Sequence, residues 1–471
     1  MAGRMGSGWH RRLLGGAGLM LALTWAAAAE TLSDTLVEAY RSSPLLEQQR
    51  LLLRANDEDV AVAVSALRPA ISFQSSLSRT IARGPDLLGR SVTTRATGAA
   101  LQLVLDYTLL DGGQRSLRIA AAKEGVLGAR YQLLQLEQVV LLDAITAYLD
   151  LRLAAQIVDV RQSNVRLIGE QLRAAEDRFE VGEVTRTDVA LAQSALAAAE
   201  SLLAAARGQV DIAREAYRRA VGSLPDGPLA PLPPAPALPP GVDRSQALAL
   251  QVHPLISAGQ HQVAALTLLA DARAADRLPQ LGAGLNIGRV RDRGDDITAS
   301  ITAQVPIYTG GRLPALQRQA IAQAQAARAD LADTGREIVE GVGNAWAVLE
   351  VARAQIAATD EGVRAAQLAA DGLREEALLG ARTTLDVLDA EQDLLAARTD
   401  RVQAEVDAQL AVYQVLASIG LLTTEHLGLT VERYDPSDYY NAVAGAPQRV
   451  VVQPSEQGRR LDGVLRRFGR D

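Results

Sequence analysis

Two pairs of segments in this chain alternate between apolar and polar residues with a period of two. One pair lies at about residues 70–109 and the other at about 279–309. The apolar positions are Ile71, Phe73, Leu77, Leu101, Leu103, Leu105, Tyr107 and Leu109 in the first pair, and Leu281, Ala283, Leu285, Ile287, Ile301, Ala303, Val305 and Ile307 in the second. This alternation predicts four β-strands of about 10 residues, each with one apolar face. Such strands are typical of membrane barrels, although two half-buried hairpins of a soluble domain would show the same pattern.

Each strand pair is followed by a long segment with helical periodicity, at about residues 113–181 and 311–379. In the first of these segments proline is absent, and large side chains recur every seven positions, at Leu127, Leu134, Leu141 and Tyr148. At about 1.5 Å per residue, each segment predicts a helix about 100 Å long. The chain then turns at a glycine, Gly182 or Gly380, into a shorter return helix. Helices of this length must lie side by side.

The two halves of the chain repeat each other. Gly182 recurs as Gly380 and Asp188 recurs as Asp386, both at an offset of 198 positions. A constant offset between several such pairs indicates an internal duplication.

Upstream of the long helices the offset changes. Pro69 recurs as Pro279, which is an offset of 210. The first half therefore carries 12 extra residues (210 − 198), in the segment around residues 79–95.

The duplication sets the expected domain organisation. The first structural repeat covers residues 30–222 and the second covers 243–420. Between them, residues 223–242 are rich in proline and predict an extended linker. Residues 421–471 form a C-terminal tail that we expect to be partly flexible.

The N-terminus has the pattern of a secretory signal peptide, residues 1–29. Basic residues up to Arg12 precede the uncharged stretch Leu13–Ala29, which ends in four alanines. This order of basic, apolar and small residues predicts export and cleavage near Ala29. A single membrane anchor is the alternative interpretation.

The composition narrows the possible functions. The sequence has 48 Lys+Arg and 55 Asp+Glu, a net charge of −7, and Lys123 is its only lysine, so we expect no nucleic-acid partner. It has no cysteine, which excludes disulfides, thiolate metal sites and a lipid-anchored N-terminal cysteine. Aromatic residues make up only 3%, which is typical of long, closely packed helices.

No arrangement of residues points to catalysis. The four histidines form no His-Glu-x-x-His motif, and the sequence has neither a phosphate-binding loop nor a Gly-x-Ser-x-Gly turn. We therefore expect a protein that is not an enzyme and that uses no cofactor and no metal. A soluble periplasmic coiled-coil scaffold is a competing interpretation, but it leaves the strands at matched positions unexplained.

The strand count points to an oligomer. Four strands cannot close a barrel, and an open sheet edge is not tolerated in lipid. Three copies of four strands give 12, so a homotrimer is the simplest closed arrangement.

Taken together, these features resemble the TolC family of trimeric outer-membrane efflux proteins. Two motifs carry the likeness, the strand-to-helix motif Val305-Pro306-Ile307-Tyr308-Thr309-Gly310-Gly311 and the helix turn Gly380-Ala381-Arg382-Thr383-Thr384-Leu385-Asp386-Val387-Leu388-Asp389. The resemblance covers roughly residues 31–430. It implies a mostly α fold with a β membrane part: an internally duplicated, trimeric 12-stranded β-barrel, four strands per chain, continuous with a long α-helical coiled-coil periplasmic tunnel.

The resemblance also assigns roles to turn residues. It implies that Gly112, Gly113, Pro306, Gly310 and Gly311 form the strand-to-helix turns.

The same resemblance implies a periplasmic gate at the far end of the tunnel. By motif, Asp386 and Asp389 form acidic rings, and Arg382 locks the gate by reaching toward Thr187 and Asp188 across the turn. Asp386 and Asp389 lie three residues apart, so both can face the lumen from one helix. Ordinary helix capping is the alternative interpretation for Asp188 and Asp386.

Two further family features concern the tips. At the position of a tyrosine that stabilises the gate in the family, this chain has Ala377, which puts one gate hydrogen bond in doubt. Residues 179–184 and 377–382 correspond to the tips where the family meets its periplasmic adaptor, with Gly182 and Gly380 expected to have positive φ.

The resemblance implies a channel in the outer membrane of a Gram-negative bacterium, with a periplasmic extension and outer-membrane lipid around it. The expected function is export of a protein cargo by type I secretion, with an inner-membrane ABC transporter and a periplasmic adaptor, or membrane fusion, protein. The segment Thr424-Glu425-His426-Leu427-Gly428-Leu429 looks like the tail of exporters of the adenylate cyclase–haemolysin type. The alternative is the outer-membrane channel of a multidrug or small-molecule efflux pump driven by protons or ATP.

Overall fold

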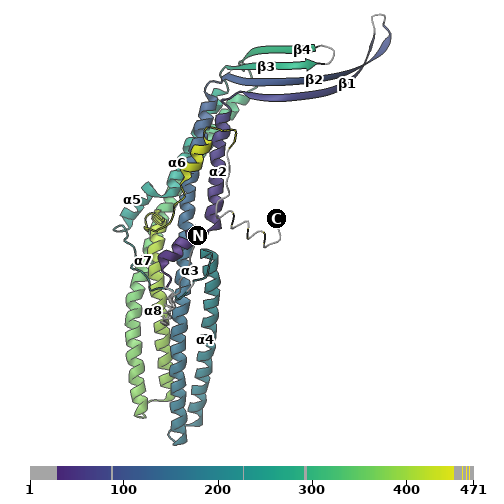
Figure 1. The fold of residues 1–471 in the computed structure, drawn as a ribbon. Coiled ribbons are helices and arrows are strands. Elements are labelled where there is room, and N and C mark those ends of the chain that lie inside the picture. The colour runs from purple at the N-terminus through teal and green to yellow at the C-terminus, as the bar shows by residue number, and fades with distance from the viewer. Residues whose placement is uncertain are drawn as a thin grey trace, which may run out of the picture.

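The computed structural model describes residues 29–85, 89–225, 227–290 and 294–449, together with Arg459, Gly463 and Arg466. The predicted signal peptide therefore lies outside the described residues except for Ala29, as does most of the tail beyond residue 449. A four-stranded sheet occupies one end of an elongated molecule, and a bundle of helices runs away from it (Figure 1).

All neighbouring strands of the sheet are antiparallel, in the order β1-β2-β3-β4. The strands are β1 (Ala70–Pro85), β2 (Ser91–Leu110), β3 (Gln280–Val290) and β4 (Gly294–Gln304). Ile71 lies opposite Leu105 in the first hairpin, and Leu281 lies opposite Ala303 in the second. These two pairs are related by the offsets 210 and 198, so the two hairpins have the same register.

Two expectations about the strands were wrong in detail. The strands of the first hairpin have 16 and 20 residues rather than about 10, because the extra segment around residues 79–95 continues the β-ladder to Pro85 opposite Ser91. In the second half, β4 stops at Gln304, so Val305 and Ile307 are not part of a strand. Pro306 lacks the N–H that a ladder needs, which explains the earlier end.

The helices of the two halves match in length. The long helices are α3 (Gln114–Glu180) and α7 (Arg312–Leu378), each with 67 residues. The return helices are α4 (Arg186–Val221) and α8 (Thr384–Ile419), each with 36 residues. Each return helix packs along the long helix that precedes it, so each half ends in a helical hairpin (Figure 1).

Two further helices precede the sheet in each half. The pairs are α1 (Leu32–Ser42) with α2 (Pro44–Ser65), and α5 (Val242–Val252) with α6 (Pro254–Ala275). In both halves a proline opens the second helix, at the position where its missing N–H costs nothing. Helix α2 packs on α3, and α6 packs between α3 and α7.

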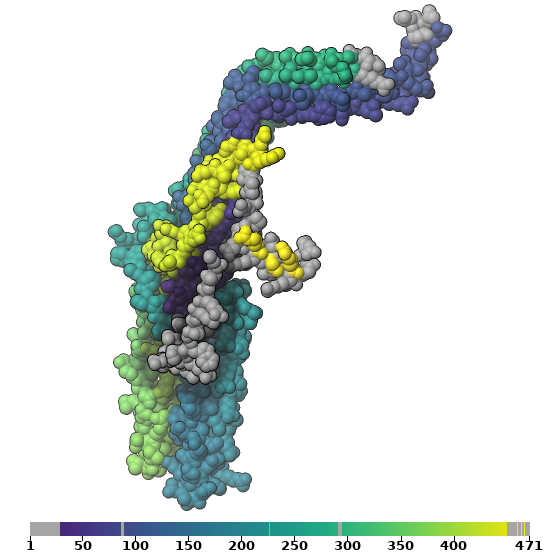
Figure 2. Space-filling model, in the orientation of Figure 1, coloured from purple at the N-terminus to yellow at the C-terminus, as the bar shows by residue number. Residues whose placement is uncertain are grey.

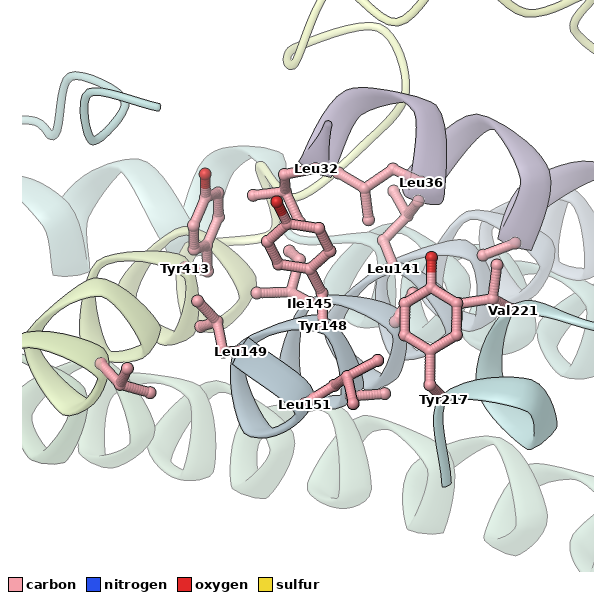
Figure 3. Close-up of a cluster of buried hydrophobic side chains, with 14 of the residues drawn as sticks. Leu32, Leu36, Leu141, Ile145, Tyr148, Leu149, Leu151, Tyr217, Val221 and Tyr413 are labelled. Atoms are coloured by element: carbon pink, nitrogen blue, oxygen red, sulfur yellow. The ribbon is translucent and has the colours of Figure 1, made fainter. Parts of the chain in front are cut away.

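The main apolar core lies where α1 crosses the middle of the bundle (Figure 3). Tyr148 and Tyr217 are fully buried in it. The Tyr148 hydroxyl donates a hydrogen bond of 3.0 Å to the carbonyl of Ala230, in the proline-rich linker. The Tyr217 hydroxyl lies 2.9 Å from Thr35 Oγ1 on α1. Because the polar ends of both rings are satisfied, the core can hold the linker and the N-terminal helix against the bundle.

The chain after α8 packs back along the bundle toward the sheet. It contains α9 (Pro436–Val443), which lies against α2. The Tyr439 hydroxyl donates to Glu58 at 2.7 Å, and the Arg54 guanidinium stacks over the Tyr439 ring. Figure 2 shows this segment on the surface, below the sheet.

Candidate functional site at the helical tips

The two helical hairpins turn at the end of the molecule farthest from the sheet (Figure 1). Gly182 and Gly380 have φ of +80° and +75°, the left-handed conformation expected for them. Each glycine N–H donates to a carbonyl three residues earlier, at Phe179 and at Ala377. The positive φ lets the chain leave one helix and enter the next within a few residues.

Both return helices begin with the same capping box. The Thr185 N–H and hydroxyl donate to Asp188 Oδ2 at 2.8 and 2.7 Å, and the Asp188 N–H donates to Thr185 Oγ1 at 3.3 Å. Thr383 and Asp386 repeat this arrangement, with distances of 2.9, 2.8 and 3.3 Å. Capping is therefore one role of Asp188 and Asp386, whatever else they do.

The caps also set the charge of the two carboxylates. The hydroxyl and backbone N–H of Thr185 lower the pKa of Asp188, and the backbone N–H and hydroxyl of Thr383 lower the pKa of Asp386. Each threonine donates to the ionised form of the carboxyl, which favours that form. Both aspartates are therefore anionic at neutral pH.

A groove of about 660 Å³ lies between the two tips. Its lining residues come from both helical hairpins and include Arg178, Asp188, Arg374, Gly380 and Arg382. The structure thus brings Arg382 and Asp188 to one groove, although they are almost 200 positions apart in the sequence.

Within the single chain, Arg382 binds a residue that the sequence did not single out. Its Nε donates to Glu376 Oε2 at 2.8 Å across the turn, and both side chains are about half exposed. The hydrogen bond and charge of Glu376, with a smaller contribution from Asp386, raise the pKa of Arg382. The paired glutamates Glu375 and Glu376, just before the turn, were a signal that sequence reasoning could have used.

The remaining predicted gate residues lie outside the groove. Asp389 and Thr187 are exposed and Asp386 is half-buried, and none of the three lines the groove. The groove therefore combines only the basic residue and one acidic residue of the predicted gate.

Sequence reasoning missed an ion pair just behind the second tip. Arg374 on α7 pairs with Glu391 on α8, whose side chain is 1% exposed, and with Asp371 at 2.6 Å. By the offset of 198, the first half has Glu176 and Gln193 at these places and so cannot form the pair. Among the residues that the structure describes, charge therefore cross-links the second hairpin at this level and not the first.

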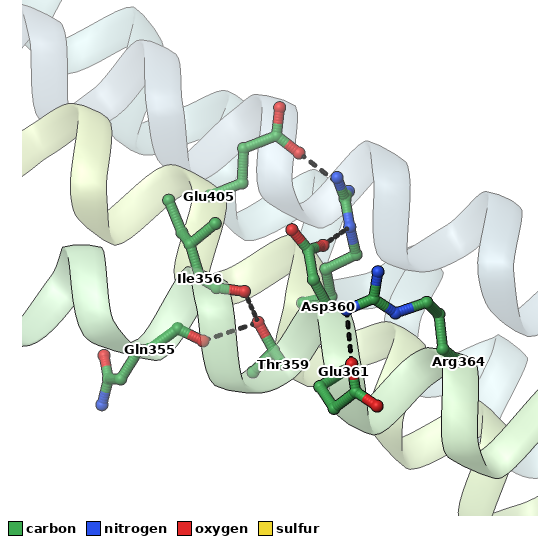
Figure 4. Close-up of polar contacts among 8 residues, drawn as sticks. Gln355, Ile356, Thr359, Asp360, Glu361, Arg364 and Glu405 are labelled. Atoms are coloured by element: carbon green, nitrogen blue, oxygen red, sulfur yellow. Dashed lines mark hydrogen bonds and ion pairs between the residues drawn. The ribbon is translucent and has the colours of Figure 1, made fainter.

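A second ion-pair group joins the same two helices farther from the tip. Arg401 Nε on α8 donates to Asp360 on α7 at 2.7 Å, and its Nη1 lies 3.2 Å from Glu405 (Figure 4). Partial exposure limits its strength, because water screens the charges. It nevertheless adds a polar link between α7 and α8.

The predicted strand-to-helix turns lie at the opposite end of the bundle. Gly112, Gly113, Gly310 and Gly311 all have positive φ, between +60° and +85°. Asp111 Oδ1 accepts a hydrogen bond of 3.1 Å from the Gly113 N–H, which stabilises the first turn.

Among the described residues, no group of three or more His, Asp or Glu side chains could hold a metal ion.

Comparison with known proteins gives a consistent result. A family model described as outer membrane efflux protein matches residues 35–223 and 246–421. The outer membrane efflux protein BepC of Brucella suis is 40% identical over 427 residues, which cover 89% of this chain and 91% of that protein. The alkaline protease secretion protein AprF of Pseudomonas aeruginosa is 27% identical over 310 residues, covering 63% of this chain and 64% of AprF.

A solved structure agrees with the fold. The Campylobacter jejuni CmeC outer membrane channel superposes with a TM-score of 0.74, at 14% identity, over 93% of this chain and 98% of that chain.

Proposed function

Since this chain belongs to the outer membrane efflux protein family, the TolC family of channels, we propose that three copies of it form one export channel. As a member it is an outer-membrane transport protein with a periplasmic helical tunnel, and it is not an enzyme. The main observation that supports a trimer is the structure of the sheet. Its apolar face is exposed in the single chain. The outer edges of β1 and β4 pair with no strand among the described residues.

The exposure of that face supports closure with other copies in a membrane. Ile71, Phe73 and Leu77 on β1 are 65, 68 and 79% exposed, and Ile301 on β4 is 74% exposed. A sheet with such a face and two free edges would aggregate in water. Three copies joined edge to edge give a 12-stranded barrel that removes both edges and presents the apolar face to lipid.

The helices support the same assembly. Helices α3 and α7 have equal length, yet 17 residues of α3 are buried in the single chain against 8 of α7. Leu368 on α7 is 77% exposed. Among the described helices, α4 alone is long and apolar enough by composition to cross a membrane, and most of that stretch is unburied. Neighbouring copies in a tunnel would cover these surfaces.

We propose that the tips form the periplasmic gate. Asp386 and Asp389 of three copies place six carboxylates at the mouth. When the gate closes, Arg382 exchanges its partner Glu376 for Thr187 and Asp188 on the facing tip, across the groove. The shared groove of Arg382 and Asp188 supports this exchange.

The acidic ring can be tested by block with multivalent cations in planar bilayers. The variant Asp386→Ala/Asp389→Ala should relieve the block, because it removes six carboxylates from the mouth. Thr185→Ala, which loses the capping box of the other half without removing a gate residue, should leave the block unchanged. Unchanged block in the double variant would contradict the ring.

The lock can be tested by channel conductance. Arg382→Ala should raise the open probability, because the link to Asp188 is lost. Glu376→Ala removes only the ion pair seen within one chain and should leave the channel closed. If Glu376→Ala opens the channel as much as Arg382→Ala does, the link across the tips is not the lock.

For the cargo, we propose type I secretion of a protein. An inner-membrane ABC transporter would supply the energy, and a periplasmic adaptor would dock on the tips around Gly182 and Gly380. The secretion relative AprF supports a protein cargo. Docking would open a passive tunnel by breaking the Arg382 links.

A second candidate is small-molecule efflux with a proton-driven or ATP-driven pump. The 40% identity to BepC, which is named an efflux protein, favours it.

Deletion of this protein from its source bacterium separates the two functions. Loss of one or a few large proteins from the culture supernatant, measured by mass spectrometry and restored by complementation, would establish secretion and identify the cargo. An unchanged supernatant with increased sensitivity to detergents and dyes would establish efflux instead.

A further inference from the structure

The first hairpin extends beyond the second at the end of the sheet farthest from the helices (Figure 1). Strand β3 ends at Val290, opposite Ala100 of β2. The β1–β2 ladder continues beyond this level to the pair Pro85–Ser91. The part of the extension beyond the pair Arg79–Thr97 contains the residues that have no counterpart in the second half.

Three arginines of the extension lie on the apolar face. In β1 the odd-numbered residues Ile71, Phe73 and Leu77 share one face, and Arg79 and Arg83 continue the same alternation. Arg95 lies directly opposite Ile81, so its side chain is on this face as well.

The three guanidinium groups are close enough to act together. Arg79 and Arg83 are the two diagonal neighbours of Arg95 across the ladder, and such neighbours lie about 7 to 8 Å apart, within reach of long side chains. All three residues are exposed. Within residues 70–110, leaving out 86–88, no carboxylate forms an ion pair with any of them.

The second hairpin provides a contrast at the equivalent position. By the offset of 210, Arg79 corresponds to Arg289, and by the offset of 198 its cross-strand partner Thr97 corresponds to Asp295. Arg289 Nε donates to Asp295 Oδ1 at 2.8 Å, so this arginine is neutralised. In the first hairpin the carboxylate is replaced by a hydroxyl, and the positive charge remains.

The position of Arg79, Arg83 and Arg95 along the strands matches the outer boundary of a membrane. Arg79 lies nine residues from the start of β1 at Ala70, which is about 30 Å along the strand and roughly 20 Å across a membrane at a tilt of about 45°. Arg83 lies about 10 Å higher by the same geometry. The apolar band of an outer-membrane barrel is about 25 Å tall. With Ala70 at the inner edge of the band, Arg79 lies just below its outer edge and Arg83 just above it.

We propose that Arg79, Arg83 and Arg95 bind the phosphate groups of anionic lipids in the outer leaflet of the outer membrane. Guanidinium groups form paired, charge-assisted hydrogen bonds with phosphate oxygens. Ile81, between them and 60% exposed, and the apolar residues below contact the acyl chains of the same lipid. The inference rests on the proposed barrel, because only closure of the sheet turns this face to lipid, but it does not depend on the cargo.

The test uses the full-length protein, purified in detergent and freed of lipid, with lipid A carrying its two phosphates as the probe. The dissociation constant is measured by fluorescence titration and the stoichiometry by native mass spectrometry. The variants are Arg79→Gln/Arg83→Gln/Arg95→Gln, the charge-retaining triple lysine variant Arg79→Lys/Arg83→Lys/Arg95→Lys, and the matched control Arg289→Gln.

The parent protein should bind lipid A at least about tenfold more tightly than the triple glutamine variant does. Dephosphorylated lipid A should bind the parent protein about as weakly as lipid A binds the variant. Arg289→Gln should stay within about twofold of the parent protein, and the triple lysine variant should retain most of the affinity.

Three results would overturn the proposal. One is equal binding of lipid A by the parent protein and the triple glutamine variant. Another is equal binding of phosphorylated and dephosphorylated lipid A by the parent protein, which decides the matter even if the variant does not assemble. The third is equally tight binding of a phosphorylated glucosamine headgroup without acyl chains, which would indicate a soluble phosphate ligand. A parent protein that is not trimeric by native mass would instead refute the proposed barrel.

Discussion

The two halves of this protein share one backbone plan and differ in their charges at both ends. Equivalent helices have identical lengths, and the two hairpins have the same register. At the membrane end, Arg79 faces Thr97 where Arg289 faces Asp295.

At the tip the second half again has an ion pair that the first half lacks. The second half has the ion pair of Arg374 with Glu391, and the first half has Glu176 and Gln193 in its place. Charge differs between the halves at both ends, the regions that we propose to meet lipid and a periplasmic adaptor. The asymmetry between the repeats therefore indicates where each half has a task of its own.

The largest expected effect is on the second tip. Arg374→Ala leaves Glu391 buried without its partner, which should lower the free energy of local opening of the α7–α8 hairpin by about 3 to 5 kcal/mol. Hydrogen exchange at the two tips measures this. Glu176→Ala, at the equivalent place on α3, should change the hydrogen-exchange rate at the first tip very little. Equal effects of the two variants would show that the ion pair does not distinguish the halves.

The strand-to-helix turns offer the next test. Gly112 has φ of +65°, and an added Cβ would lie 2.5 Å from Leu278 Cδ1 and 2.8 Å from Leu278 Cβ. Gly310 has φ of +60° and open space around it. Both alanine variants incur backbone strain of about 1 kcal/mol, and Gly112→Ala should lose about 2 kcal/mol more through overpacking. Thermal unfolding followed by circular dichroism compares them, and equal melting temperatures would contradict the clash.

A buried carboxyl makes the first half pH-sensitive. Asp57 on α2 is fully buried, where the second half has Thr267 by the offset of 210. Burial raises the pKa of Asp57 to about 6, although Arg130 and Arg54 oppose the shift and Glu58 adds to it.

The sign of the pH dependence follows from this shift. Because the pKa is higher in the folded state, the stabilisation from Asp57 is complete below about pH 4 and is lost as the pH rises through 6. Asp57→Asn should remove this dependence and stabilise the protein at pH 7 by up to about 2 kcal/mol. Unfolding midpoints between pH 4 and 8 test it, with Thr267→Asn as the control. A slope that persists in Asp57→Asn would assign the dependence to another group.

The smallest effect on stability should come from exchanging the cross-strand partners at the membrane end. Thr97→Asp creates for Arg79 the ion pair that Arg289 has, and Asp295→Thr removes the latter. Each should change stability by less than about 0.5 kcal/mol, because the pairs are exposed. Thr97→Asp should nevertheless weaken lipid A binding by a few-fold, since it neutralises one arginine. Unchanged lipid binding in this variant would argue that Arg79 makes no contact with phosphate.

Much of the fold could be predicted because it depends on local patterns. The period of two, the heptads and the turn glycines Gly182 and Gly380 act within a few residues of the chain. The length of the first hairpin was harder to predict, because Arg79, Arg83 and Arg95 interrupt the apolar alternation that marks a strand. The early end of β4 is explained by Pro306, which was read as part of the motif rather than as the end of the ladder.

The candidate site was predicted less completely. The motif placed Arg382 and Asp188 at facing tips, but it did not indicate Glu376 as the partner of Arg382 within the chain. Glu376 and Asp188 are both carboxylates near Arg382. Only the side-chain geometry shows that Arg382 binds Glu376 within the chain. The pair of Arg374 and Glu391 was missed because neither residue is unusual for an exposed helix until the two helices are docked.

By itself, the sequence determined the duplication, the alternation of strands and long helices, and the positions of the turns, because each of these depends on residue type and spacing. The tertiary structure alone decided which charges are paired. Asp57 is buried with Tyr439 and Arg130 around its helix, from segments that are distant in the sequence. Ion pairing and burial depend on distances of a few ångströms between such segments, and residue spacing along one chain does not specify those distances.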